Sequence, residues 1–210
     1  DPNSICSKCY ADSTCKRYHA LQENMKRNSD ILTNTLFEIS DFPLINAVIF
    51  RFEAFGDLIN KTQCMNYFRL CKANPHVHFA LWTKNPGIVK QAIAAGESKP
   101  ENLVILLSSA KIGERVNPEK WDFVDKTFTV YRKNEMDLKM INCGSRCCLS
   151  CQRCYHKETE NDIREYLKKH QIALPEDAAD VCLTELQAQI PQAKKIGYVT
   201  EMMDAAIYLE

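Results

Sequence analysis

Short apolar segments alternate with amphipathic segments along the first half of the chain. Apolar runs rich in β-branched and aromatic residues occupy residues 47–52, 77–82 and 102–107, which is the pattern of buried strands. Between them, residues 62–73 and 87–95 carry apolar side chains at helical spacing. This order predicts consecutive right-handed βαβ units, and therefore an α/β fold with a largely parallel sheet.

Weaker patterns extend this arrangement. Residues 127–132 alternate as a further strand does, and residues 139–142 form a short one, so about five strands are expected. Five strands are too few for a closed eight-stranded barrel, and we predict an open or partial (β/α) barrel. Before the first strand, residues 16–37 have the pattern of one helix.

The character of the chain changes after Tyr155. Charged helical patterns follow, at residues 158–170, 175–189 and 198–208. We therefore predict two parts, an α/β domain over residues 1–155 and a helical tail over residues 156–210.

Composition narrows the classes of function. Hydrophobic residues make up 45% of the chain and charged residues 26%, which is typical of a globular protein. The 27 basic and 27 acidic residues cancel, so no global field attracts nucleic acid or anionic lipid. No apolar run approaches the roughly 18 residues that cross a bilayer. We expect no membrane partner and a cytoplasmic location, and the sequence leaves a protein or nucleic-acid partner open.

Eleven cysteines are unusual for such a chain. Cys6, Cys9 and Cys15 form what we call the first cysteine group. The second cysteine group consists of Cys143, Cys147, Cys148, Cys151 and Cys154. Cysteines bunched at gaps of two and three residues favour a metal site over a disulfide framework. Cys64 and Cys71 lie on the apolar stripe of a predicted helix, so we interpret them as packing residues.

Thiolates at two-residue gaps reach one metal ion or one face of a cluster, because the short loop between them turns both sulfurs inward. Cys148, Cys151 and Cys154 have ferredoxin-type spacing, for which Cys143 is the natural fourth ligand. Counted from Cys147, the spacing is instead the C-x3-C-x2-C of radical S-adenosylmethionine (SAM) enzymes. The sequence does not choose between these registers.

Together the two groups hold eight thiols, enough for one or two clusters of the 4Fe–4S type. Zinc is the alternative metal, because C-x2-C pairs also form zinc knuckles. Five cysteines in the second group exceed what a structural zinc needs, which favours iron–sulfur.

Polar residues follow the ends of the first two predicted strands, where α/β proteins place ligands. We predict a substrate-binding set there, composed of Arg51, Glu53, Asp57, Thr83 and Lys84. Arg51 lies inside an apolar strand and needs a partner, either an acidic neighbour such as Glu53 or a bound anion. The alternative interpretation is structural, with Asp57 capping the next helix and Lys84 solvated.

Four segments, in this order, resemble the phage gene product 88 family: CSKCYA at 6–11, FRFEAFGD at 50–57, FALWTK at 79–84 and CGSRC at 143–147. The resemblance covers about residues 5–155 and leaves the helical tail outside. The family is found in phages and mobile elements and is similar to a reduced radical SAM protein. It implies a cluster-bearing α/β scaffold more firmly than an activity.

Two departures from radical SAM enzymes bear on the chemistry. The first cysteine group lacks the C-x3-C-x2-C spacing, and the group that has it follows the sheet instead of the first strand. Two functions therefore remain open. One is a redox or radical enzyme with S-adenosylmethionine as a further cofactor, whose catalytic residues the sequence does not identify. The other is a regulatory or macromolecule-binding protein in which clusters or zinc act as structural staples or redox sensors.

Overall fold

The computed structural model describes residues 1–144 and 147–167 of the chain. The chain divides into two compact units, residues 1–143 with 152–167, and residues 144–151 with 168–210. We call the first of these the sheet unit. The helices predicted at 175–189 and 198–208 lie outside the described residues, as does Cys182.

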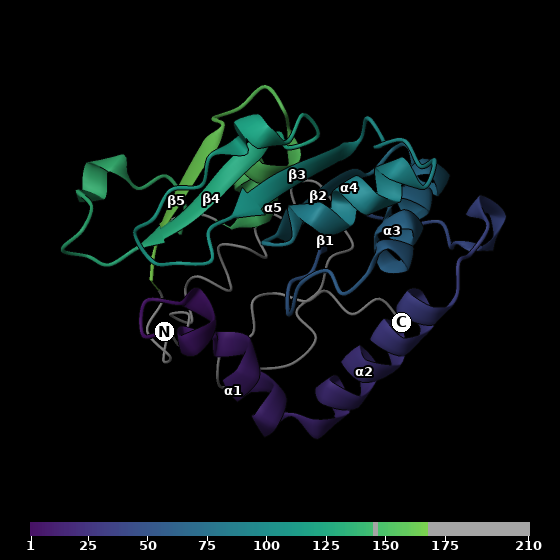
Figure 1. Cartoon of the computed structure of the whole chain (residues 1–210), viewed down its shortest axis with the longest axis horizontal. Helices are drawn as coiled ribbons and strands as arrows, with labels where there is room; N and C mark the ends of the chain where they lie inside the picture. The colour runs from purple at the N-terminus through teal and green to yellow at the C-terminus, as the bar shows by residue number, and fades with distance from the viewer. Residues whose placement is uncertain (145–146, 168–210) are drawn as a thin grey trace. The chain divides into compact units, whose positions relative to one another are not determined.

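The sheet unit is built on five parallel strands that neighbour one another in chain order (Figure 1). The strands are β1 (Ile49–Phe52), β2 (His78–Thr83), β3 (Leu103–Ser108), β4 (Lys126–Tyr131) and β5 (Asp162–Tyr166). The sheet is open, since β1 and β5 pair with only one neighbour each among these strands. The predicted α/β class with an open, parallel sheet is confirmed.

Helices precede and separate the first strands. The α-helices are α1 (Tyr10–Arg17), α2 (His19–Asn34), α3 (Lys61–Ala73), α4 (Pro86–Ala94) and, outside the sheet unit, α5 (Cys148–Cys151). Short 3-10 turns occur at Ile5–Lys8, Ile39–Asp41, Pro118–Lys120, Leu138–Met140 and Arg153–Tyr155. The single helix predicted over 16–37 is interrupted, because Tyr18 has extended backbone angles (φ −116°, ψ 90°) between α1 and α2.

The two faces of the sheet are covered differently. On one face, alternate residues such as Phe52, Phe79 and Ile105 form the main core with α3 and α4. Cys64 and Cys71 of α3 are fully buried in this core, which confirms that they are packing residues. We call the opposite face the cysteine face, because Ala80, Val104, Leu106 and Ile163 pack there with Tyr155, Cys143 and Cys154.

The strand predicted at 139–142 and the helix predicted at 158–170 are both wrong. Leu138–Met140 is a 3-10 turn, and the fifth strand is instead Asp162–Tyr166, paired with β4. Only Ile163 of that strand is buried, so its charged neighbours carried no strand pattern. Hydrogen bonds to β4 override the local preference for helix, which is a weak one.

Buried asparagines hold the chain before β1 against α3. The amide nitrogen of Asn66 donates to the carbonyls of Leu32 (2.8 Å) and Thr35 (2.7 Å), and its oxygen accepts from the backbone of Phe37 (3.0 Å). Asn66 is fully buried. These bonds pair backbone groups at the end of α2 and hold the segment that leads from α2 toward β1.

Replacing Asn66 with alanine should lower the free energy of unfolding by about 2–4 kcal/mol, because it leaves buried backbone groups unpaired. Urea denaturation followed by circular dichroism measures the loss. Asn134→Ala, at an exposed position after β4, should change stability by less than about 0.5 kcal/mol. Equal losses in the two variants would contradict the role given to Asn66.

Candidate functional site at the carboxyl edge of the sheet

The N-terminal segment that leads into the first cysteine group is paired with the loop that follows β3. Ser4 and Lys111 form an antiparallel bridge, the backbone N–H of Ile5 donates to Ala110 (3.0 Å), and that of Ile112 donates to Asn3 (2.9 Å). Because β3 ends at Ser108, this pairing brings the first cysteine group to the carboxyl edge of the sheet.

The first cysteine group sits on short helical segments. The Ser4 side chain accepts from the backbone N–H of Cys6 (3.2 Å), and the N–H of Cys9 donates to the carbonyl of Cys6 (3.3 Å). Cys6 is exposed, while Cys9 and Cys15 are partly buried. Chain geometry therefore closes the C-x2-C pair into a tight loop.

The surroundings of Cys15 alter the pKa of its thiol. Its sulfur lies 3.5 Å from the sulfur of Met25, and burial, then the charges of Cys9 and Asp12, raises the pKa of Cys15. A nearby cation would have the opposite effect and favour the thiolate.

Cys143 lies beside β5. Its backbone N–H donates to the carbonyl of Arg164 (3.1 Å), and its sulfur lies 3.9 Å from Oε1 of Glu165. The preceding residue, Asn142, bonds on both sides of this point, donating to the carbonyl of Asp162 (2.9 Å) and accepting from the N–H of Arg164 (2.8 Å). The backbone around Cys143 is therefore held in a fixed position along the edge strand.

Cys154 packs into the cysteine face near a buried lysine. The ammonium of Lys126 donates to Oγ1 of Thr159 (3.0 Å) and to the carbonyls of Thr159 and Glu160 (3.1 Å each). Burial lowers the pKa of Lys126, whereas the negative charge that Cys154 carries as a thiolate acts to raise it. Lys126 would in turn stabilise a Cys154 thiolate.

The remaining members of the second cysteine group, Cys147, Cys148 and Cys151, lie on or next to the single turn α5, outside the sheet unit. The N–H of Cys151 donates to the carbonyl of Cys147 (3.0 Å), and the sulfur of Cys147 lies 3.7 Å from Oγ of Ser150. Positions three and four apart on a helix lie on the same face, so Cys147 and Cys148 both neighbour Cys151. The turn leaves both predicted ligand registers open.

Within residues 1–144 and 147–167, no three His, Cys, Asp or Glu side chains converge closely enough to hold a metal ion. The donor chemistry nevertheless fits an iron–sulfur cluster. Thiols that are closely spaced along the sequence lie in the segment tied to the carboxyl edge and on the α5 turn, and Lys126 places a positive charge beside Cys154.

The five predicted substrate-binding residues separate into different environments. Asp57 accepts hydrogen bonds from Oγ1 of Thr83 (2.7 Å) and the N–H of Lys84 (2.9 Å), and the Lys84 ammonium lies 3.8 Å away. These three residues are brought together and connect the loop after β1 to the loop after β2. Asp57 is not the N-cap of α3, because Asn60 occupies that position.

Glu53 is oriented toward α3. Its Oε1 accepts from the hydroxyl of Tyr67 (2.6 Å) and the amide of Gln63 (2.8 Å). Burial raises the pKa of Glu53, the Tyr67 bond lowers it, and the charge of Asp57 raises it further. Burial, together with Glu53, also raises the pKa of Tyr67. Tyr67 and Gln63 were not predicted from the sequence, because Tyr67 lies on the apolar stripe of the predicted helix and Gln63 carries no pattern of its own.

Arg51 lies on the cysteine face, away from Glu53. Its guanidinium carbon is 4.2 Å from the ring centroid of Trp82, and Nε is buried without a hydrogen-bond partner. The expectation that Glu53 neutralises Arg51 is therefore not met among the described residues, and a bound anion remains the other prediction.

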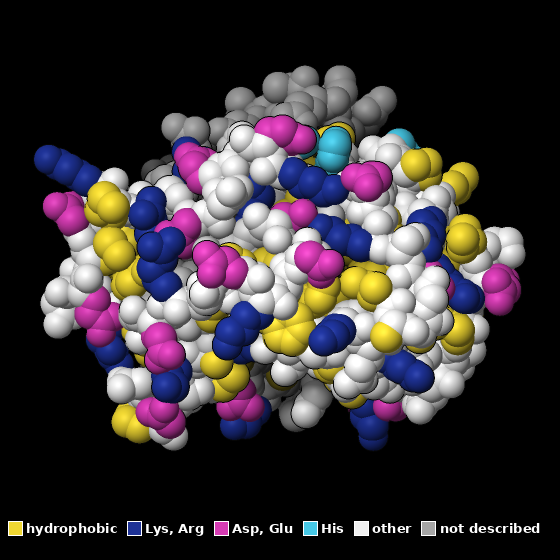
Figure 2. All heavy atoms as spheres, turned by 45° about the horizontal axis from the view of Figure 1, so that its top comes forward, with side chains coloured by type: hydrophobic (Ala, Val, Ile, Leu, Met, Phe, Trp, Pro, Cys, Tyr) yellow, Lys and Arg dark blue, Asp and Glu magenta, His cyan; other side chains and the backbone are white. Residues whose placement is uncertain are grey.

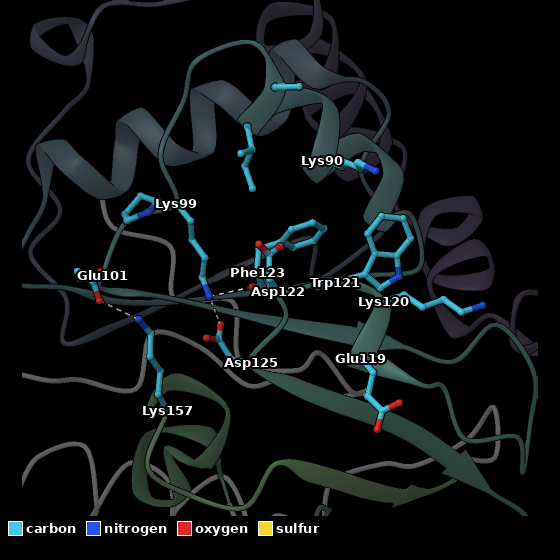
Figure 3. Close-up of a pocket in the computed structure, with 13 residues that line it drawn as sticks. Lys90, Lys99, Glu101, Glu119, Lys120, Trp121, Asp122, Phe123, Asp125 and Lys157 are labelled. Carbon is cyan, nitrogen blue, oxygen red and sulfur yellow. Dashed lines mark hydrogen bonds and ion pairs between the residues drawn. The ribbon is translucent and has the colours of Figure 1, made fainter.

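A hollow of about 830 Å³ lies at the opposite edge, where the chain enters β3 and β4 (Figure 3). It is lined by Lys90, Ile93, Ala94, Lys99, Pro100, Glu101, Glu119, Lys120, Trp121, Asp122, Phe123, Asp125 and Lys157. The Lys99 ammonium lies 2.5 Å from Oδ2 of Asp125, and Lys157 lies 3.0 Å from Glu101. Lysines and carboxylates balance there and no cysteine lines it, so we interpret it as a solvated structural hollow.

The face drawn in Figure 2 carries charges of both signs. Figure 2 shows basic and acidic side chains interspersed over one face, as the equal numbers of the two in the sequence predict. Among the described residues, none of the helices has the length and apolar character that a membrane crossing requires.

Replacing Glu53 with glutamine should make stability less dependent on pH. Because the folded-state pKa of Glu53 is raised, the wild type loses stability as the pH rises from about 4.5 through the folded-state pKa, whereas glutamine stays neutral and can still accept both bonds. The free energy of unfolding of the variant relative to the wild type should therefore increase between about pH 4 and pH 7.

Urea denaturation at several pH values measures this difference, with Glu23→Gln, at an exposed position of α2, as the control. A difference that stays constant across this range would show that folding does not perturb Glu53.

A family model described as Gene product 88 matches residues 2–157. No curated protein and no solved structure matches the chain. The match ends near the close of the second cysteine group and leaves β5 outside. It names no cofactor, so the likeness to radical SAM proteins stays a prediction. The match spans more than half of the sequence, and the chain belongs to the gene product 88 family.

Proposed function

We propose that this chain binds one or two iron–sulfur clusters of the 4Fe–4S type through the thiolates of its two cysteine groups. The ligands would be Cys6, Cys9 and Cys15 in the first group, and Cys154, Cys151 and members of the set Cys143, Cys147 and Cys148 in the second. The reducing conditions that keep such thiols available are those of the cytoplasm, where we expect the protein to act.

One observation carries the proposal. The backbone pairing of Ser4 with Lys111, and of Ile5 with Ala110, ties the C-x2-C-x5-C segment to the carboxyl edge of a parallel sheet. Ligands of α/β proteins bind at that edge, because the loops after all the strands meet there. A disulfide scaffold would need no such placement, since this chain already has a large apolar core.

The chain's own residues would shape the cluster environment. Lys126, held beside Cys154 by carbonyl oxygens, offsets negative charge on a ligating thiolate. The Asn142 bonds to β5 hold Cys143 in position, as groups next to a ligand usually do. A bound cluster supplies one-electron transfer.

The reaction is a further part of the proposal. An open parallel sheet with a cluster at its carboxyl edge suits a redox or radical enzyme, for which S-adenosylmethionine is a candidate cofactor. The alternative is a regulatory protein that binds a protein or nucleic acid and uses clusters, or zinc, as staples or redox sensors. Cleavage of S-adenosylmethionine by the reduced protein would favour the enzyme, and no cleavage would favour the alternative.

Anaerobic purification followed by iron, sulfide and zinc analysis of one sample tests cluster binding. Two clusters predict a brown protein with about eight irons and eight sulfides per chain, and one cluster predicts about four of each. A colourless protein that contains zinc and no sulfide would refute the proposal.

Cys9→Ser should reduce the iron content by about half if two clusters are present, because a three-thiolate group loses one ligand. Cys64→Ala is the matched control, since that thiol is fully buried in the main core, and its iron content should equal that of the wild type. The comparison is made on anaerobically purified protein of each variant. Equal iron in Cys9→Ser and Cys64→Ala would exclude the first group as a ligand set.

A further inference from the structure

Arg51 points along the cysteine face toward the carboxyl edge. Arg51 pairs with Ala80 in the register of β1 and β2, so Trp82 is its diagonal neighbour two residues nearer that edge. The guanidinium carbon lies 4.2 Å from the Trp82 ring centroid. Tyr155 packs edge-on against the same indole, with ring centroids 6.2 Å apart, and fixes it in place. The guanidinium is therefore held on a rigid aromatic platform.

This stacking does not use the N–H donors of Arg51, which make no hydrogen bond to the described residues. A cation–π contact uses the flat face of the guanidinium, while all its N–H donors lie in the plane. Nε is buried and has no hydrogen-bond partner within residues 1–144 and 147–167. A buried donor without a partner costs about 1–3 kcal/mol, so an acceptor in the guanidinium plane would recover this loss.

The described part of the chain supplies no carboxylate for this purpose. Glu53 faces α3 and accepts from Tyr67 and Gln63. Asp57 accepts from Thr83 and from the backbone of Lys84. Within residues 1–144 and 147–167, the Arg51 guanidinium makes no ion pair.

We propose that Arg51 binds the carboxylate of a small-molecule ligand at the carboxyl edge. The planar fork of a guanidinium matches the two oxygens of a carboxylate, and stacking on Trp82 fixes its orientation. A carboxylate fits better than a phosphate, because the Arg51 guanidinium makes no ion pair with the described residues, whereas Lys84, the cation that follows β2, lies 3.8 Å from Asp57.

A second polar group extends the same surface. Ser108 ends β3 on the cysteine face, and its side chain makes no hydrogen bond within the described part of the chain. Two strand spacings separate β1 from β3, about 10 Å, which a small metabolite spans. The segment that leads into the first cysteine group is paired with the loop after β3. A carboxylate held by Arg51 would therefore orient the rest of the ligand toward that cysteine group. As a substrate contact, this inference rests on the proposed function.

Trp82 itself can report binding. The chain has two tryptophans, so Trp121→Phe leaves Trp82 as the only indole beside Arg51. Sodium acetate, sodium phosphate and sodium chloride are titrated at equal ionic strength into the full chain, and Trp82 fluorescence is followed. Acetate should produce a saturable change that chloride does not.

Arg51→Met and Arg51→Lys, made in the same background, should each weaken the acetate response by at least about tenfold, since a lysine keeps the charge but loses the fork. Arg115→Met is the matched control, because that arginine pairs with Asp162 and its side chain is 66% exposed. The control should respond as the parent does.

Three results would overturn the inference: no saturable response to acetate in the parent, a response to phosphate alone, or an unchanged acetate response in both Arg51 variants. The outcome does not depend on iron, since the fluorescence of Trp82 is read in colourless protein as well. Loss of the acetate response in brown protein would reject the carboxylate site alone, whereas a normal response in iron-free protein would reject the cluster alone.

Discussion

Parallel pairing of the five strands is the constraint on which the rest of the structure depends. Because neighbouring strands run in the same direction, the chain leaves every strand at the same edge of the sheet. The loop after β3 then offers backbone groups at that edge, and the N-terminal segment pairs with them through Ser4 and Ile5. A cysteine group at the start of the chain is thereby brought to the place where an α/β protein binds its ligand.

The polar groups of this edge divide into those that hold the fold and those that remain available. The Asp57 carboxylate accepts hydrogen bonds from Thr83 and Lys84, and the Glu53 carboxylate accepts from Tyr67 and Gln63. These bonds fix the loops after β1 and β2. Arg51 is turned to the opposite face and uses only the surface of its guanidinium. The Arg51 guanidinium makes no ion pair with the described residues, which is why we propose it as the contact for a small anionic ligand.

The sequence predicted the first four strands well, because β1 to β3 are apolar runs and β4 keeps the alternation of a strand. It missed β5, where only Ile163 is buried and the strand forms through hydrogen bonds to β4. It likewise missed the interruption at Tyr18, which is a local change of backbone angles within a continuous helical pattern. The residues at the ends of β1 and β2 were predicted from the sequence. Arg51 and Glu53 nevertheless lie in different environments, because the side chains of a strand alternate between the two faces of the sheet. The side chains that meet in space cannot be identified from their positions along the chain alone.

The same limit applies to the cysteines. Spacing groups Cys6 with Cys9, and Cys148 with Cys151, but the placement of the first group beside β3 depends on pairing between residues more than 100 positions apart. Cys143 and Cys154, eleven residues apart, both lie on the cysteine face because Asn142 pairs with β5 and Tyr155 packs on β2 and β3. Contacts of this range are set by the whole fold.

The most direct test of the central claim is Mössbauer spectroscopy of the full chain, produced with iron-57 and kept anaerobic. Cluster binding predicts protein-bound iron in tetrahedral sulfur coordination, with the magnetic coupling of a cluster. Iron bound only through oxygen and nitrogen, or no protein-bound iron, would contradict it.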